Sequence, residues 1–294
     1  MGSPIHVALV PENVDVDASE VTSVAGAVSK QVARDFGPIW SIDATVDPFM
    51  KLEDVPVGYW PIIITDNVQG AEGYHQDKNG QPFALIKFHG EWSITASHEC
   101  LEMLADPFGN KLQAGNLLDQ AVDLGMDPAR VQYLVEVCDP SESANFSYQV
   151  DGVQVSDFYT PQFFDPVQAP DVRYSFTGAV DAPRKILDGG YISWTDPVST
   201  NWFQLRMFPD EFSSDLPHVI NLTTQTTFEL FKQADGLRGA SDRVTRPTYW
   251  VQKEGEALEK ARARGKMADR AQAARAESFR RHIAELIQSA KGGG

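Results

Sequence analysis

The chain has 294 residues, 42% of them hydrophobic, and carries a net charge of −16. This length and apolar content predict a folded protein with a sizeable core. The acidic balance argues against a general nucleic-acid binder, because a phosphate backbone attracts basic surfaces. Two cysteines, Cys100 and Cys138, are too few for a disulfide framework.

The chain shows no sign of export or of insertion into a membrane. No apolar run approaches the roughly 20 residues that a membrane-spanning helix needs. The opening MGSPIHVALV lacks the charged start and the long apolar stretch of a signal peptide. We therefore expect a cytoplasmic protein without a membrane partner.

The first third of the chain alternates strand and helix patterns. Asp17 and Glu20 fit a capping box at the start of a helix, and Gly37 is placed to end it. Asn79-Gly80 is a hairpin turn signal, and Pro107 disfavours helical geometry in the residue before it. In order, the predicted elements are a strand at 5–10, a helix at 17–37, strands in IWSIDATVDPF and YWPIIITD, a hairpin in EGYHQDKNGQPFALIKFHG and a helix at 93–105.

The remainder is richer in strands until about residue 212. The stretch from 108 to 130 has an irregular or weakly helical pattern. Strands are predicted in ARVQYLVEVCDP, YISWTD and NWFQLRMF, with a hairpin in SYQVDGVQVSDF. We predict an α+β domain over residues 1–212, with a β-rich C-terminal part. Residues 213–294 form a helical extension, partly exposed or flexible, that is expected to serve a protein partner or self-assembly.

The helix predicted at 93–105, within TASHECLEMLADP, carries an unusual polar stripe. At about 100° per residue, one sector collects Thr95, His98, Glu99, Glu102 and Asp106, while the rest is apolar. Acids at i, i+3 and i+4 repel one another, and more so where water is scarce. The run contains no lysine or arginine. A bound metal ion would offset these charges, with the stripe opening into a cleft.

The spacing within this stripe favours a metal site. His98 and Glu102 lie one turn apart, so their side chains can converge on one ion, and Glu99 points beside it. This is the geometry of the H-E-x-x-H zinc helix, in which the first glutamate is the general base. An ordinary hydrogen-bonded helix pair is the alternative interpretation of His98 and Glu102.

Residues outside the helix are needed to complete the ligand shell. Asp106 lies eight positions from His98, about 12 Å along a helix, which is too far unless the chain breaks first. Glu136 and Asp139 in YLVEVCDP are better candidates, because buried strands seldom place a glutamate between valines. The alternatives are a water-facing Glu136 and a turn role for Asp139. His75 is either a polar hairpin residue or a residue that acts on the substrate.

Three blocks of the sequence resemble the zincin metallopeptidases. SHECLEMLADP, EVCDP and VSDFYTP come in the same order as in a bacterial group of zincin-like proteins, over roughly residues 5–165. The resemblance implies a mixed sheet with one helix across it, an edge hairpin and then the active-site helix. It also implies that His98 and Glu102 bind the metal, that Glu99 is the general base and that Glu136 is the downstream carboxylate ligand.

The implied function is hydrolysis of a peptide bond in a peptide or protein substrate by a water molecule that Zn²⁺ activates. One departure from the family pattern affects this expectation. Glu102 replaces the second histidine, and the added negative charge makes the ion a poorer Lewis acid. Oxygen-rich sites also suit Mn²⁺ or Ca²⁺. The alternative function is a non-catalytic zincin-like protein that binds or assembles, with a structural metal or none.

Overall fold

The computed structural model describes residues 4–66, 68, 72–78, 80–210 and 213–224. Residues 225–294, which make up most of the predicted helical extension, lie outside these residues. Helices and several sheets alternate along the described chain, which confirms the predicted α+β class. No helix of the described part combines the length and apolar character needed to cross a membrane.

A five-stranded mixed sheet forms the N-terminal part of the molecule. Its strand order is β2-β1-β3-β5-β4, and β4, the last strand, runs antiparallel to β5 while the other pairs are parallel. The predicted hairpin is therefore confirmed, and it occupies one end of the sheet. The strands are β1 (Ile5–Pro11), β2 (Ala44–Pro48), β3 (Tyr59–Thr65), β4 (Gly73–Lys78) and β5 (Gln81–Lys87).

The helix after β1 starts as predicted but ends differently. Asp17 caps α1 (Ala18–Gln31) by accepting a hydrogen bond from the amide of Ser19. The prediction that Gly37 ends this helix is wrong, because the chain continues through a π-helical turn at Val32–Phe36 into α2 (Gly37–Trp40). A Cβ atom at Gly37 would lie 2.5 Å from the carbonyl oxygen of Ile42. The glycine is thus required by a close backbone approach and not by a helix end.

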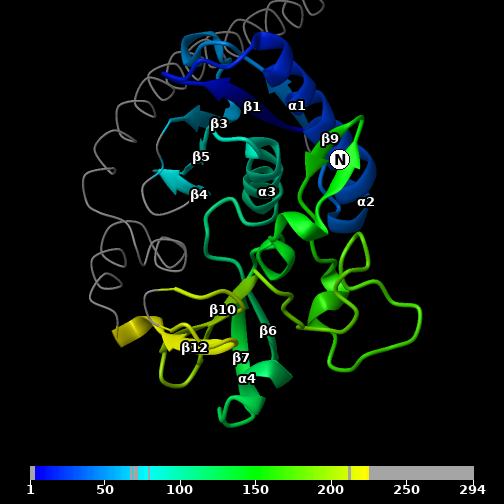
Figure 1. Cartoon of the computed structure of the whole chain (residues 1–294), viewed down its shortest axis with the longest axis vertical. Coiled ribbons are helices and arrows are strands. Elements are labelled where there is room, and N and C mark those ends of the chain that lie inside the picture. Colours follow the sequence, from blue (N-terminus) through cyan, green and yellow to red (C-terminus); the bar gives the residue numbers. More distant parts are fainter. Residues whose placement is uncertain (1–3, 67, 69–71, 79, 211–212, 225–294) are drawn as a thin grey trace, which may run out of the picture.

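Two helices cover one face of the first sheet. Buried side chains of α1 and of α3 (Trp92–Ala105) belong to the same apolar core as the alternate residues of β1, β3 and β5 that face them. Figure 1 shows α3 near the middle of the molecule, between the first sheet and the strands of the second. The predicted helix at 93–105 is confirmed to within one residue. The opposite face of the sheet packs on a smaller apolar cluster that includes Leu52, Val55 and Val68.

The second half of the chain builds another five-stranded sheet, in the order β12-β11-β10-β7-β6, with all pairs antiparallel. Strand β6 falls in the stretch predicted to be irregular or weakly helical, and β12 falls in the range predicted to be a helical extension. The strands of this sheet are β6 (Leu112–Asn116), β7 (Arg130–Leu134), β10 (Tyr191–Thr195), β11 (Trp202–Arg206) and β12 (His218–Asn221), and the short helix α4 (Asp119–Asp123) lies between β6 and β7 in the chain.

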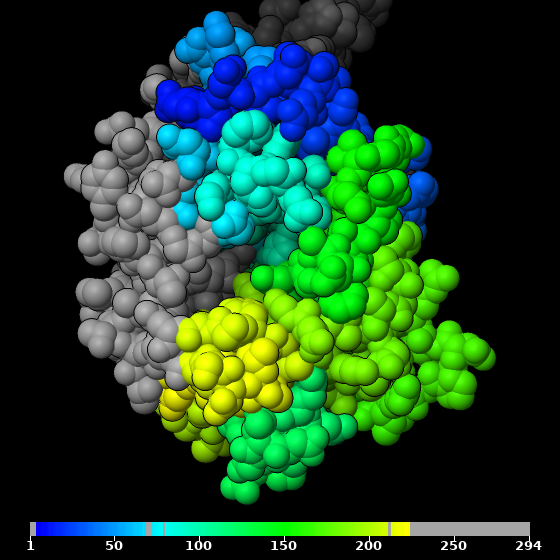
Figure 2. Space-filling view, viewed as in Figure 1, coloured from blue at the N-terminus to red at the C-terminus, as the bar shows by residue number. Residues whose placement is uncertain are grey.

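A small hairpin packs against α1 and α3. Strands β8 (Tyr148–Val150) and β9 (Val153–Val155) pair as the Asp151-Gly152 turn signal predicts, and both turn residues have positive φ. In the space-filling view, the surface is hollowed where the cyan, green and yellow segments of the chain meet (Figure 2). Helix α3, which carries the polar stripe, lies between the two sheets (Figure 1).

Candidate metal centre

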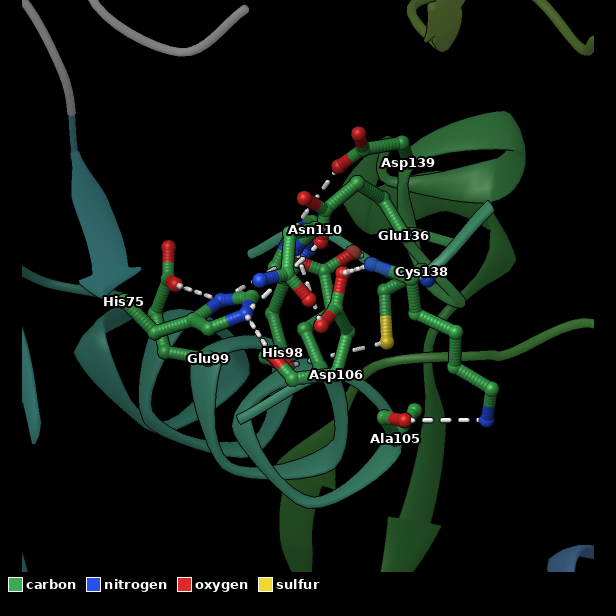
Figure 3. Close-up of polar contacts among 11 residues, drawn as sticks. His75, His98, Glu99, Ala105, Asp106, Asn110, Glu136, Cys138 and Asp139 are labelled. Carbon is green, nitrogen blue, oxygen red and sulfur yellow. Dashed lines mark hydrogen bonds and ion pairs between the residues drawn. The ribbon is translucent and has the colours of Figure 1, made fainter. Parts of the chain in front are cut away.

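Six side chains from three separate segments converge beside α3. They come from the helix itself, from strand β4 and from the loop that follows β7, and Figure 3 shows most of them directed toward one another. We call this set the carboxylate–histidine cluster; its members are His75, His98, Glu99, Glu102, Glu136 and Asp139.

A buried hydrogen-bonded network fixes α3 against its neighbours. The hydroxyl group of Ser97 donates to Oε1 of Gln31 on α1 at 2.8 Å and accepts from the amide of Ser156 at 2.9 Å. Nε2 of Gln31 donates in turn to the carbonyl oxygen of Ser156 at 2.8 Å. All three side chains are buried, so breaking one bond would leave polar groups unsatisfied. The network therefore holds the adjacent residue, His98, in a defined position.

One group of donors surrounds His98. Its Nε2 lies 3.2 Å from Oε2 of Glu102 and 3.2 Å from Oδ1 of Asp139. The other oxygen of Glu102 accepts a hydrogen bond of 3.0 Å from the amide of Cys138, which orients the carboxylate. Two ligands bound to one ion at about 2.0–2.2 Å have donor atoms roughly 3.0–3.5 Å apart. Each of these two distances fits a pair of ligands on one metal ion, and His98 can bring a ligand atom to within 4.8 Å of those of Glu102 and Cys138, or of Asp139 and Glu142.

A second group of donors surrounds His75, on strand β4. Its Nδ1 lies 3.4 Å from Oε2 of Glu99 and 3.7 Å from Oε2 of Glu102. Its Nε2 lies 3.2 Å from the carbonyl oxygen of Asp106 and 3.8 Å from Oε2 of Glu136. His75, Glu99 and Glu102 can bring one ligand atom each to within 4.8 Å of the others. Glu102 thus belongs to both groups.

Charge and burial shift the pKa of His98 in opposite directions. Burial lowers the pKa of the imidazole, but the carboxylates of Glu102 and Asp139 raise it by more, so that it lies well above the ordinary 6.5. Burial also raises the pKa of the Cys138 thiol, whose sulfur lies 3.8 Å from the carbonyl oxygen of His98. The geometry thus favours a positive charge between His98 and its acidic neighbours, as a proton or as a metal ion.

Strand β4 provides a notch for Glu99. A Cβ atom added at Gly73 would lie 2.7 Å from Oε1 of Glu99 and 2.6 Å from Cγ2 of Thr95. Any side chain at this position would displace the helix or the carboxylate, because real Cβ atoms do not approach other atoms so closely. The glycine is therefore what lets strand β4 pack directly over the polar stripe.

The structure brings all six sequence-predicted site residues together, with two corrections to the detail. Strand β7 ends at Leu134, so Glu136 lies in the loop that follows it, and Asp139 begins a 3₁₀ turn. The carboxylate of Asp106, which directly follows α3, accepts hydrogen bonds from the amides of Asn110 and Lys111. The polar stripe is buried and does not open widely, since Glu102 is 2% exposed and Glu99 is 4% exposed.

Sequence reasoning missed Tyr159. Its amide donates to the carbonyl oxygen of Val137, so the tyrosine lies beside the loop that carries Glu136. Its ring stacks on Phe163 with centroids 4.5 Å apart, and its buried hydroxyl has no hydrogen-bond partner among the described residues. Burial is the main cause of its raised pKa, and Glu136 is the next. The sequence signal that could have pointed to Tyr159 is its position within VSDFYTP, one of the three blocks that resemble the zincin-like proteins.

Comparisons with known proteins give no further guidance. No family model matches the chain, and the searches of curated proteins and of solved structures found no match either. The function must therefore be inferred from the geometry of the cluster.

Proposed function

We propose that the protein is a metal-dependent hydrolase that cleaves peptide bonds in a peptide or protein substrate in the cytoplasm. One observation carries the proposal: Oε2 of Glu102 and Oδ1 of Asp139 each lie 3.2 Å from Nε2 of His98, which in each pair is the spacing expected of two ligands on one ion. These three donors come from a helix and from a loop about 40 positions downstream, so sequence proximity does not explain their meeting.

The order of elements supports a zincin-like fold. The first sheet is mixed, its last strand β4 is antiparallel, and the hairpin that contains β4 directly precedes α3. Helix α1 crosses the face of the sheet on which α3 also packs. This arrangement is the one implied by the resemblance of SHECLEMLADP, EVCDP and VSDFYTP to the zincin metallopeptidases.

His98, Glu102 and Asp139 are the residues that would hold the ion. One nitrogen and two carboxylate oxygens form a donor set that Zn²⁺ accepts and that also suits Mn²⁺, whereas Ca²⁺ prefers more oxygen ligands. When bound there, a divalent ion supplies polarisation of a carbonyl group and lowers the pKa of water.

The remaining members of the cluster supply the proton chemistry. Glu99 follows His98 in α3, and in this proposal its carboxylate takes a proton from water and delivers it to a leaving amine. Nδ1 of His75 lies 3.4 Å from this carboxylate. Glu136 lies on the other side of His75 and adds to the negative potential around the imidazole.

A second candidate function is favoured by the burial of the cluster. Glu102, Glu136 and Asp139 are each at most 4% exposed, which is more typical of a structural site than of an open catalytic one. In this alternative the same donors hold a structural metal, and the protein binds a partner or assembles. Both candidates require the metal, but only the first cleaves a substrate.

The test uses the purified full-length chain. Elemental analysis should find at least one divalent ion per chain, and peptide libraries should be cleaved by the metal-loaded protein. Glu99→Gln should abolish cleavage while the ion at His98 remains, because Glu99 is not among the three donors of that ion. Glu91→Gln, the same substitution at an exposed residue just before α3, is the matched control and should change neither result. Absence of bound metal would refute both candidates.

A further inference from the structure

A single carboxylate oxygen links the two donor groups of the cluster. Oε2 of Glu102 lies 3.2 Å from Nε2 of His98 and 3.7 Å from Nδ1 of His75. The other oxygen of Glu102 is engaged by the amide of Cys138. One oxygen therefore faces both imidazoles, in the position that a bridging ligand takes between two ions.

The hydrogen-bonding pattern of His75 defines which of its nitrogens can bind an ion. Nε2 lies 3.2 Å from the carbonyl oxygen of Asp106, which can only accept, so Nε2 carries a hydrogen. In the neutral imidazole, Nδ1 then carries a lone pair. This lone pair faces Oε2 of Glu99 at 3.4 Å and Oε2 of Glu102 at 3.7 Å, which are also acceptors. Three electron-rich atoms that face one another require a cation or a proton between them.

We propose that the cluster is a two-ion centre, in which a second divalent cation binds between Nδ1 of His75, Glu99 and Glu102. The backbone carbonyl of Asp106 accepts a hydrogen bond from Nε2 of His75 and so fixes its tautomer. Metal-binding histidines commonly have such a hydrogen-bond partner on the ring nitrogen that does not bind the metal. The three donor atoms lie within 4.8 Å of one another, and the Gly73 notch holds Glu99 toward them. Glu102 is the shared ligand.

The charges and the surroundings of the cluster agree with two ions. Two divalent cations carry four positive charges, which equals the number of carboxylates in the cluster. The hydroxyl of Tyr159 is fully buried and has no hydrogen-bond partner among the described residues, and the backbone of Tyr159 is bonded to Val137 in the loop that carries Glu136 and Asp139. Two-ion sites about 3.5–4 Å apart stabilise both the attacking and the leaving atoms of a hydrolytic reaction.

This inference rests on the proposed function and changes one role in it. Glu99 becomes a ligand of the second ion, so another carboxylate of the cluster must accept the proton of the attacking water. The reaction class remains hydrolysis, and the first ion keeps its donors at His98 and Asp139.

The test measures how many ions the full chain binds. Metal-free protein is dialysed against Mn²⁺ at several concentrations, and bound manganese is counted by elemental analysis. We expect two ions per wild-type chain and an electron paramagnetic resonance spectrum with the splitting of a coupled Mn²⁺ pair. Glu99→Gln and His75→Gln should each bind one ion and lose the coupling. Glu91→Gln should retain both. Circular dichroism of each variant checks that it is folded.

The outcomes separate this inference from the proposed function. A single ion per wild-type chain at saturating Mn²⁺, with an uncoupled spectrum, overturns the two-ion centre and leaves the one-ion hydrolase standing; in that case a proton on His75 separates the acceptors. No bound ion overturns both proposals. Because the number of ions on the wild-type chain decides between one and two, the test succeeds even where a variant fails to fold.

Discussion

Replacement of Gly73 by alanine tests whether strand β4 and α3 are packed as closely as the centre requires. The new methyl carbon would lie 2.7 Å from Oε1 of Glu99, which must retreat by about 0.7 Å to reach an ordinary contact of 3.4 Å. Cγ2 of Thr95, at 2.6 Å, must retreat as well. Overpacking of this kind costs about 1–3 kcal/mol. The loss of freedom in the unfolded chain offsets about 0.4–1 kcal/mol. We expect a net decrease of about 1–2 kcal/mol in the free energy of unfolding.

Urea unfolding followed by circular dichroism measures this difference, and bound metal is counted on the same samples. Gly26→Ala is the matched control, because a Cβ atom there meets nothing within 4 Å and alanine favours the interior of α1 by about 1 kcal/mol over glycine. We therefore expect opposite signs for the two alanine variants. The reasoning is refuted if Gly73→Ala is as stable as the wild type and binds as much metal.

Three further predictions concern single groups of the centre. Glu102→Gln keeps an oxygen for the amide of Cys138 but removes the charge, so bound metal should fall from near-full occupancy to below one ion in ten chains by elemental analysis, which corresponds to a Kd about 80-fold weaker, or about 2.6 kcal/mol per ion; retained metal would contradict the assignment. In the metal-free protein, the raised pKa of His98 stabilises the fold fully below pH about 6.5, and this stability is lost as the pH rises through the higher folded pKa. His98→Gln should therefore flatten the alkaline decline of the unfolding free energy, and an unchanged decline would count against it. Tyr159→Phe removes a hydroxyl without a hydrogen-bond partner among the described residues and should change stability by less than about 1 kcal/mol, whereas a loss of 1–3 kcal/mol would reveal a bond to that hydroxyl.

Local patterns in the sequence predicted the elements that position the centre. The 3.6-residue period of TASHECLEMLADP predicted α3 and its polar stripe, and the Asn79-Gly80 signal predicted the β4–β5 hairpin. The pairing of His98 with Glu102 follows from helical geometry alone. These features depend on neighbours within a few positions, which is the range over which propensity and periodicity act.

Features that depend on distant packing could not be predicted in the same way. Strand β6 contains a glycine and an asparagine and shows no clear alternation, so its strand state comes from pairing with β7. The continuation of the chain past Gly37 depends on the approach of Ile42. His75 was predicted either as a polar hairpin residue or as a residue that acts on the substrate, because nothing local indicates that its ring lies near both Glu99 and Glu136. The hydroxyl of Tyr159 is similarly placed by its stacked ring and by a backbone bond to Val137.

The members of the cluster belong to different halves of the molecule. His75 is anchored in the first sheet, whereas Asp139 follows β7 of the second. A cation held by donors from both would act as a cross-link between the halves, and ligand binding to the native state alone stabilises it by RT ln(1 + [L]/Kd). Removal of the metal should therefore make the contact between the two halves less stable. Protease cleavage in the loop around residues 135–142 should then be faster in the presence of a chelator.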